Sequence, residues 1–286
     1  MKIAYLGPEG SYSHLAAQTF LKAETPKTNK KVNDWDECIP FRNFAEVFAA
    51  VENDRVDCAA VPIENSVQGG VLQNLDLLQA YENLYAVKSL IIRVDHRLVY
   101  KAGTKLNEIG RVYSHRQALD QCVNFLSEKM PFAALREAES TGFGLSRAME
   151  DESGKSAAIA GAHTGNLRSG FVMSEESIAD EKNNYTHFLL IKKGRETLPA
   201  SSSRVYFSAV CPHRPGSLLE LLQIIARYGI NMTKIESRPV KNKVGDYRFF
   251  IEADCDIAKK EVQDMLCAIE ENTLESKLLG AYCLQE

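Results

Sequence analysis

Paired cysteines and histidine ligand motifs are missing from this sequence. The seven cysteines occur singly, without a C-x-x-C pair or a histidine at the spacing that metal sites use. The six histidines form no H-E-x-x-H or similar pair. We therefore expect no metal site. We also expect most cysteines to be small buried apolar side chains, because a reactive thiol requires an electropositive and accessible setting.

Long apolar runs and basic clusters are missing as well. No run approaches the roughly 18 apolar residues that cross a bilayer, and the opening residues MKIAYLGPEG lack the long apolar core of a secretion signal. The formal net charge is -4, and no group of lysines and arginines alternates with aromatic residues. We therefore expect a cytoplasmic protein that acts on a small molecule, with neither nucleic acid nor a membrane as partner.

What the sequence contains is typical of a globular α/β protein. A length of 286 residues with 45% hydrophobic content allows one large domain or two ordinary ones. The alternation of strand and helix periods predicts a largely parallel sheet, and residues 84–100 are interpreted as extended crossings between two lobes. Strands are expected at 2–6, 58–63, 111–114, 157–160 and within 183–192, and helices at 13–21, 43–52, 117–128 and 162–168.

A change of composition marks the best linker in the chain. Residues 194–203 read GRETLPASSS and lie between two apolar strand patterns. The order beyond them is strand, helix, strand, strand, helix, strand, which describes a ferredoxin-like βαββαβ sandwich. We therefore divide the chain into a two-lobed region over residues 1–193, the linker, and a small module over residues 204–286.

The segment 61–78, VPIENSVQGGVLQNLDLL, interrupts an apolar run with polar side chains and a glycine pair. The run at 58–63 predicts a buried strand, and open α/β sheets bind ligands just beyond the carboxyl ends of strands. Three polar residues fall at that point: Glu64, Asn65 and Ser66. A second interpretation stays open, in which Asn65 or Ser66 caps the next helix while the glycines form a turn.

Several motifs in a fixed order give this chain a family resemblance. GPEGSYSHLAA, VPIENSVQGGVLQNLDLL, YSHRQALDQC and NNYTHFLLI follow one another, and GSLLELL and ESRP come after them. In this order they resemble the prephenate dehydratases that carry a C-terminal ACT domain, over nearly the whole chain. The resemblance implies an α/β fold: a periplasmic-binding-protein-like (type II) catalytic region with two lobes, followed by a βαββαβ ACT module.

The resemblance also implies an activity. Prephenate would lose its ring carboxylate as carbon dioxide and its ring hydroxyl as water, leaving phenylpyruvate, with L-phenylalanine as feedback regulator. This chemistry needs neither a redox cofactor nor a metal. Hydroxide leaves slowly unless it is protonated or strongly hydrogen-bonded, and the resemblance assigns that assistance to Thr186. A threonine hydroxyl is a weak acid, so we interpret it as a hydrogen-bond donor or proton relay.

The other site residues follow from the same motifs. Asn65 would hydrogen-bond the substrate, and Glu64 would orient it or exchange a proton. The remaining substrate-binding positions are Gly7, Pro8, Ser66, Ser114, Gln121, Glu139, Ser140, Thr141, His187 and Phe188. For Ser140 and Thr141, simple capping of a helix stays open as an alternative.

One position departs from the family pattern. His187 stands where the family usually has arginine, and histidine offers at most a partial charge and single contacts in place of a permanent bidentate cation. Either an anion protonates His187 or another cation replaces the arginine. Arg116 is a candidate for that cation, although it is also readily interpreted as a surface arginine.

In the C-terminal module, two segments match the phenylalanine-sensing motifs of ACT domains. They comprise Pro215, Gly216, Ser217 and Leu218, and Glu236, Ser237, Arg238 and Pro239. Backbone groups at the Pro-Gly turn would bind the charged ends of an amino acid, and apolar neighbours would suit its benzyl group. Because ACT modules commonly pair across subunits, we expect a homodimer or homotetramer.

Two other functions stay open at this point. Arogenate dehydratase performs the same elimination on the amino analogue, and only competition between the two substrates separates these activities. A protein that senses amino acids without catalysis could also combine a solute-binding cleft with an ACT module. The secretion signal or helix-turn-helix expected of such a sensor is not evident in the sequence.

Overall fold

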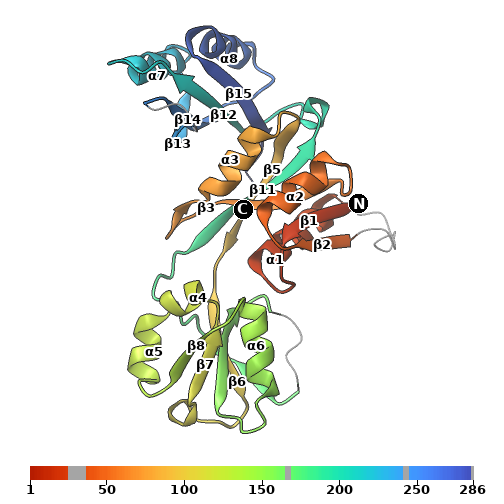
Figure 1. Ribbon diagram of the computed structural model, residues 1–286, viewed down its shortest axis with the longest axis vertical. Coiled ribbons are helices and arrows are strands. Elements are labelled where there is room, and N and C mark those ends of the chain that lie inside the picture. Colours follow the sequence, from red (N-terminus) through yellow and green to blue (C-terminus); the bar gives the residue numbers. More distant parts are fainter. Residues whose placement is uncertain (25–36, 165–168, 241–244, 285–286) are drawn as a thin grey trace.

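The computed structural model describes residues 1–24, 37–164, 169–240 and 245–284. These residues form three bodies that follow one another along the long axis of the molecule (Figure 1). We call them the first lobe, which lies in the middle, the second lobe and the C-terminal module. Within the described ranges, none of the helices combines the length and the apolar character that a bilayer crossing needs.

The first lobe is a sheet with helices on both faces. Its elements are β1 (Lys2–Leu6), α1 (Tyr12–Glu24), β2 (Glu37–Phe41), α2 (Phe44–Glu52), β3 (Cys58–Asn65), β4 (Gly69–Gly70), α3 (Leu72–Ala80), β5 (Leu84–Arg93) and β11 (Tyr185–Lys193). The strands lie in the order β5-β11-β3-β1-β2, with β4 beside β3. Phe20 of α1 packs into the core on one face, and Phe48 of α2 and Leu75 of α3 pack into the core on the other.

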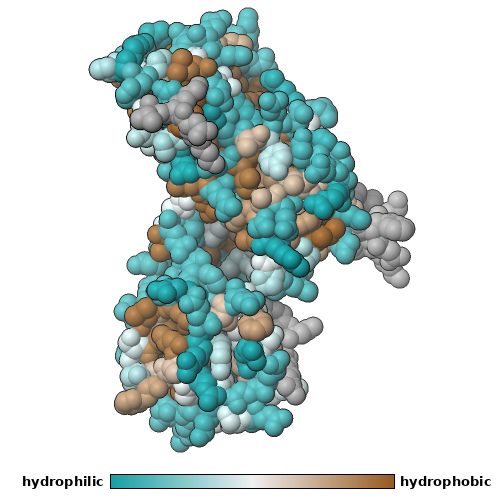
Figure 2. Space-filling view, in the orientation of Figure 1, coloured by the Kyte–Doolittle hydropathy of each residue, from teal (hydrophilic) through white to brown (hydrophobic). Residues whose placement is uncertain are grey.

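The second lobe repeats this layered plan with a smaller sheet of order β10-β6-β9-β7-β8. Its elements are β6 (His96–Lys101), η1 (Leu106–Glu108), β7 (Arg111–Ser114), α4 (Arg116–Asp120), α5 (Val123–Lys129), β8 (Ala134–Glu137), α6 (Thr141–Glu150), β9 (Ser156–Gly161) and β10 (Phe171–Met173). Ala157 and Ile159 of β9 face α4 and α5, and the alternate residues Ala158 and Ala160 face α6. Figure 2 shows apolar residues at the surface beside α5, where Phe132 is 96% exposed.

The chain passes between the lobes twice, once from β5 into β6 and once on its return into β11, as expected for residues 84–100. The expectation of a largely parallel sheet is wrong for the middle of the first lobe, because β11 is antiparallel to both β3 and β5. The reason is the return path: β11 comes back from the second lobe and inserts between two strands that already lie there. Only β1 pairs in parallel with both of its neighbours in this lobe.

Two of the predicted helices also differ. The helix expected over 117–128 is split into α4 and α5, because the backbone N–H of Asp180 binds the Gln121 carbonyl and the Asp180 carboxylate accepts from the N–H of Asn124. Of the helix expected over 162–168, residues 162 and 163 form a turn, and residues 165–168 lie outside the described residues.

The C-terminal module has the predicted βαββαβ order. Its elements are β12 (Arg204–Cys211), α7 (Ser217–Arg227), β13 (Asn231–Pro239), β14 (Tyr247–Asp254), α8 (Lys260–Asn272) and β15 (Glu275–Tyr282), preceded by the short η2 (Arg195–Thr197). The strand order is β13-β14-β12-β15, and α7 and α8 pack on one face through Leu221, Ile225 and Met265. This is the ferredoxin-like arrangement that the sequence predicts.

The other face of the module's sheet packs on the first lobe. Tyr206 and Phe250 of the module join Leu75 and Leu78 of α3 in one buried core. The two sheets also meet edge to edge, where Gly280 of β15 pairs in parallel with Ala86 of β5. A Cβ at position 280 would lie 2.3 Å from the Ala86 carbonyl oxygen, so this junction closes only around a glycine.

Candidate active site

A cleft of about 460 Å³ lies between the two lobes. Most of the predicted site residues line it: Gly7, Pro8, Asn65, Gln121, Glu139, Ser140, Thr141, Thr186 and Phe188. They come from five separate regions of the chain, which the two crossings between the lobes bring together. The described residues of its lining include no lysine or arginine, so backbone dipoles and neutral side chains provide most of its polar groups.

Thr186 and Asn65 form the centre of the cleft wall that belongs to the first lobe. They lie directly opposite each other on the antiparallel strands β11 and β3. The Asn65 Nδ2 amide donates to Thr186 Oγ1 at 3.0 Å, which leaves the hydroxyl proton of Thr186 free to point at a ligand. Asn65 Oδ1 accepts from the backbone N–H groups of Val67 and Gln68, both at 3.1 Å. Both ends of the Asn65 amide are therefore occupied, and this geometry favours orienting Thr186 over a direct contact with a ligand.

The contacts of Asn65 exclude the alternative in which this residue caps the next helix. Asn65 Oδ1 closes a turn that leads into β4, whereas α3 begins after Val71, whose side chain makes no capping hydrogen bond. The strand β3 is also two residues longer than predicted, so Glu64 and Asn65 end it and only Ser66 lies beyond it.

A hydrogen-bonded chain runs from Asn65 across to the second lobe. Asn65 Nδ2 contacts Asn184 Oδ1 at 2.7 Å, Asn184 Nδ2 donates to Gln121 Oε1 at 3.1 Å, and Gln121 Oε1 lies 2.8 Å from His96 Nε2. Because an amide oxygen only accepts, His96 Nε2 carries the proton. Burial lowers the pKa of His96, which keeps the ring neutral near pH 7. The buried Gln121 Nε2 has no hydrogen-bond partner among the described residues.

Two helix N-termini from opposite lobes meet at the cleft. α1 begins at Tyr12 and α6 at Thr141, and both residues line it. Ser140 caps α6, since its Oγ accepts from the N–H of Phe143 at 3.0 Å, so the capping interpretation of Ser140 is confirmed. Unpaired N–H groups and the helix dipole make such ends favourable for anions.

The loop before α1 reaches the second lobe directly. His163 Nε2 lies 3.0 Å from the Gly10 carbonyl oxygen, and the His163 ring packs on Tyr12 with centroids 4.5 Å apart. Tyr12 in turn donates its hydroxyl proton to the Asp95 carbonyl at 3.0 Å. Gly7 and Pro8 are therefore held over the cleft by contacts that join the lobes.

Two predicted residues support the walls without lining the cleft. Ser114 is fully buried, and its hydroxyl donates to the Ile159 carbonyl at 2.8 Å. A Cβ at position 144 would lie 3.0 Å from the Ser114 Cα, so α6 needs Gly144 to approach β7 this closely. Ser66 Oγ donates to the Asn183 carbonyl and accepts from the N–H of Tyr185, which fastens the turn to β11.

Glu64 and His187 lie on the opposite face of the sheet from the cleft. They form the cross-strand pair next to Asn65 and Thr186, and successive strand residues point to opposite faces. Glu64 Oε2 binds Lys234 Nζ of the C-terminal module at 2.6 Å, and the His187 ring packs on Tyr282 of the module. Their location differs from the predicted one because the sequence period does not say which set of alternate residues faces a ligand.

The arginine suggested as a replacement for the family's cation also lies away from the cleft. Arg116 is exposed on α4, 3.6 Å from Asp120 one helical turn on, and it does not line the cleft. The interpretation as a surface arginine is therefore the correct one. The cation nearest the Glu64 side of the sheet is Lys234.

The two predicted effector segments line separate cavities within one chain. Pro215 and Ser217 border one of about 380 Å³ at the start of α7. Arg238 and Pro239 border another of about 530 Å³ between the module and α3, where Arg238 forms a two-point ion pair with Asp76. Gly216, Leu218, Glu236 and Ser237 line neither cavity.

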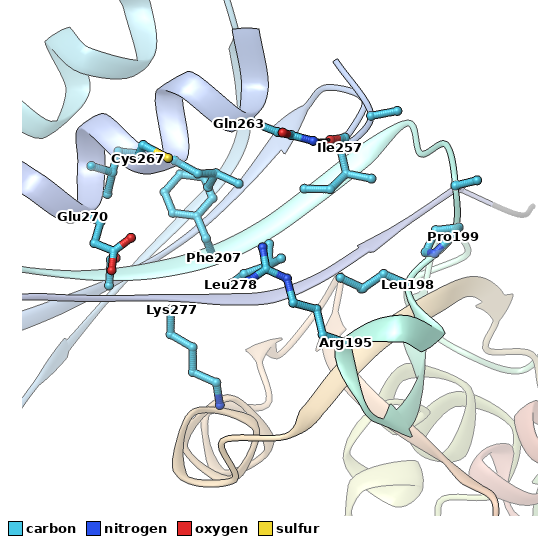
Figure 3. A pocket seen from close by; sticks show the side chains of 15 residues that line it. Arg195, Leu198, Pro199, Phe207, Ile257, Gln263, Cys267, Glu270, Lys277 and Leu278 are labelled. Carbon is cyan, nitrogen blue, oxygen red and sulfur yellow. Dashed lines mark hydrogen bonds between the residues drawn. The ribbon is translucent and has the colours of Figure 1, made fainter. Parts of the chain in front are cut away.

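A further cavity of about 570 Å³ lies between α8, β15 and the segment that joins the module to the first lobe (Figure 3). Its apolar walls include Phe207 and Leu278, with Cys267 at the rim and Arg195 and Glu270 near its ends. None of the predicted site residues lines it. In Figure 3 the Lys277 side chain points away from it toward α3, where Nζ donates to the carbonyls of Leu78, Gln79 and Tyr81.

Sequence reasoning missed Tyr12 and His96, which line the cleft, and Asn184, which hydrogen-bonds to Asn65 and Gln121. Asn184 and Tyr12 carry a signal that could have been used, because they lie in the motifs NNYTHFLLI and GPEGSYSHLAA. His96 carries no such signal. The positions of Tyr12 and His96 depend on the contact between the start of α1 and the second lobe, which is not a local property of either segment.

Comparisons with known proteins agree with this architecture. The family description "Prephenate dehydratase" matches residues 3–196, and "ACT domain" matches residues 205–270. A bifunctional chorismate mutase/prephenate dehydratase of Aquifex aeolicus is 33% identical over 99% of this chain and 73% of its own. A prephenate dehydratase of Amycolatopsis methanolica is 30% identical over 98% of this chain and 88% of its own.

Solved structures give the same result. The crystal structure of a prephenate dehydratase from Arthrobacter aurescens, in complex with L-Phe, superposes with a TM-score of 0.83 at 28% identity. The match covers 99% of this chain and 90% of that one. The two-lobed fold with a C-terminal ACT domain, expected from the sequence, is therefore confirmed.

Proposed function

The chain belongs to the prephenate dehydratase family, and from this membership we propose that it converts prephenate into phenylpyruvate, carbon dioxide and water. The observation that carries the proposal is the contact between Asn65 Nδ2 and Thr186 Oγ1 at 3.0 Å in the cleft between the lobes. It makes Thr186 a hydrogen-bond donor toward the cleft, where the leaving hydroxyl of the substrate needs one.

The cleft provides for the rest of the reaction. As the C–C bond to the ring carboxylate breaks, its electron pair enters the ring and the C–O bond to the hydroxyl breaks on the far side, so the ring becomes aromatic. The Thr186 hydroxyl donates to the departing oxygen, which stabilises the charge that develops there, and a proton from solvent completes the water molecule. The N-termini of α1 and α6 favour the carboxylates of the dianion. No step requires a metal or a redox cofactor.

The C-terminal module is proposed to bind L-phenylalanine and to inhibit the reaction. The Arthrobacter aurescens relative was crystallised with L-Phe. We keep both predicted effector segments, residues 215–218 and 236–239, as its site. Because they line separate cavities in one chain, a complete site requires a second module, or a movement that brings the two segments together.

A second copy of the module is also the basis for the proposed homodimer or homotetramer. β13 ends the described strand order, and Ile235 on β13 and Tyr247 on the neighbouring β14 are 44% and 47% exposed. An unpaired strand edge with apolar neighbours is suited to pairing with another copy. Analytical ultracentrifugation distinguishes the two states from a monomer. The cytoplasm remains the proposed location, supported by the free thiols of all seven cysteines, and cell fractionation tests it.

The test compares prephenate and arogenate as substrates of the purified protein, following phenylpyruvate and phenylalanine. We expect turnover of prephenate, and a loss of about 10²-fold or more in kcat for Thr186→Ala because the donor to the leaving oxygen is removed. Thr186→Ser keeps a hydroxyl and should retain most of the activity. Preferred turnover of arogenate would assign the alternative dehydratase activity, and no turnover of either substrate would support a non-catalytic sensor.

A further inference from the structure

The strands that carry Asn65 and Thr186 present a second pair of residues to the ACT module. Glu64 and His187 lie opposite each other on β3 and β11, one residue from Asn65 and Thr186 respectively. Both point away from the cleft. Any shift of their backbone is therefore transmitted through a single peptide unit to the residues that form the cleft wall.

The ACT module places a lysine against this pair. Lys234 of β13 is 13% exposed and its Nζ lies 2.6 Å from Glu64 Oε2, so this ion pair is partly shielded from water. On β14, next to Lys234, Glu252 accepts hydrogen bonds from Thr233 Oγ1 and Tyr282 Oη. The carboxylate of Glu252 is thus fixed by the module alone, whereas Lys234 reaches across to the first lobe.

The strand β13, which carries Lys234, makes a second contact with the first lobe. Alternate residues of this strand face the first lobe. Four residues after Lys234, the guanidinium of Arg238 binds Asp76 of α3 at 2.6 Å. Residues 236–239 are the second predicted effector segment. A movement of β13 on binding an effector would therefore displace the Lys234 amine that holds Glu64.

His187 is the adjustable partner in this interface. Its ring is partly buried, and neither its buried Nε2 nor the buried hydroxyl of Tyr206 has a hydrogen-bond partner among the described residues. The charged groups that face the ring are Glu64, Glu252, Lys234 and Arg204. Burial lowers the pKa of His187, so the ring is neutral and adds no third positive charge beside Lys234 and Arg204. The strand register also shifts directly after His187, which gives β11 a place to adjust next to Thr186.

We propose that the Lys234–Glu64 ion pair, packed beside His187, is the contact through which the ACT module sets the position of Asn65 and Thr186. This inference rests on the proposed function, whose regulation it explains. The alternative route is the linker, which begins eight residues after Thr186 at the far end of β11. The ion pair acts instead on the strand ends that form the cleft wall. Lys234 and Glu64 are positioning residues in this scheme, since neither lines the cleft.

The test uses steady-state kinetics with prephenate, with and without saturating L-phenylalanine. In Lys234→Met we expect the fold-inhibition by phenylalanine to fall about 5-fold or more relative to wild type, as loss of an allosteric coupling predicts. Lys234→Arg restores a cation that reaches Glu64 and should regain most of the response. The control is Lys193→Met, which removes a lysine ion pair with Asp54 of similar length, 2.7 Å, from the surface of the first lobe.

Glu64→Gln provides a second variant of the same contact. It should reduce the response to phenylalanine as Lys234→Met does, and the double variant should show no further loss, because both changes break one ion pair. A wild-type response in Lys234→Met and in Glu64→Gln would overturn the proposal.

Amide hydrogen exchange measures the effect of the Lys234–Glu64 ion pair on the backbone without requiring catalysis. Lys234→Met should exchange faster than Lys193→Met over residues 185–188, where β11 carries Thr186 and His187. Equal exchange over these residues would overturn the coupling whether or not the wild type turns over prephenate. A wild type that turns over no prephenate, with the exchange difference present, would instead overturn the proposed function alone.

Discussion

At the scale of single residues, the role of each side chain in the cleft depends on which of its hydrogen-bonding atoms already have partners. Asn65 uses its amide nitrogen on Thr186 and Asn184 and its oxygen on the turn at 66–68, so it holds the site in place. Thr186 keeps a free donor, its hydroxyl proton. Residues that resemble one another in the motif thus divide into those that bind and those that position.

This division predicts a non-additive pair of substitutions. Asn65→Ala should lower kcat for prephenate with little change in KM, because it removes the group that orients the Thr186 hydroxyl. Since Asn65 acts through Thr186, the double variant Asn65→Ala/Thr186→Ala should be no slower than Thr186→Ala. Losses that multiply in the double variant would show that Asn65 contributes independently, by direct contact with the substrate.

At the scale of elements, α3 is held at both ends by different parts of the molecule. Its start follows the β4 turn beside the cleft, and its end is capped by Lys277, which donates to three carbonyls that α3 and its C-terminal turn leave free. Next to it, β15 and β5 meet at Gly280. The helix and this junction together join the first lobe to the module.

The junction predicts a packing defect for a very small change. Gly280→Ala places a methyl group 2.3 Å from the Ala86 carbonyl oxygen, and relieving that overlap should cost about 1–3 kcal/mol of stability. Urea unfolding followed by circular dichroism measures the loss. Gly110→Ala is the matched control, because the nearest atom to its new methyl is 4.0 Å away. Equal unfolding midpoints for the two variants would contradict the tight junction.

At the scale of the whole molecule, fully or partly buried histidines lie at the contacts between bodies. His163 joins the loop before α1 to the second lobe, His96 ends the polar chain of the cleft, and His187 faces the ACT module. Burial lowers the pKa of each of the three below the ordinary value of 6.5. All three rings are therefore neutral in the folded protein near pH 7.

These shifts determine how stability depends on pH. Below pH 6.5 the unfolded chain binds protons at these histidines while the folded protein does not, so the free energy of unfolding falls as the pH decreases from about 7 to 5. Melting temperatures measured across this range should show the decrease, and His163→Gln should make it less steep. His213→Gln, at an exposed position, should keep the wild-type slope. An unchanged slope in His163→Gln would contradict the assignment.

The sequence by itself determined the family, the βαββαβ order of the module, and the presence of Thr186 and Asn65 in one cleft. These follow from local periodicity and ordered motifs. Only the tertiary structure decided that β11 inserts antiparallel between β3 and β5, and that Glu64 and His187 face the module while their neighbours face the cleft. The physical reason is that a period of two fixes only that adjacent residues point opposite ways. Pairing between strands more than a hundred residues apart decides which face receives the substrate.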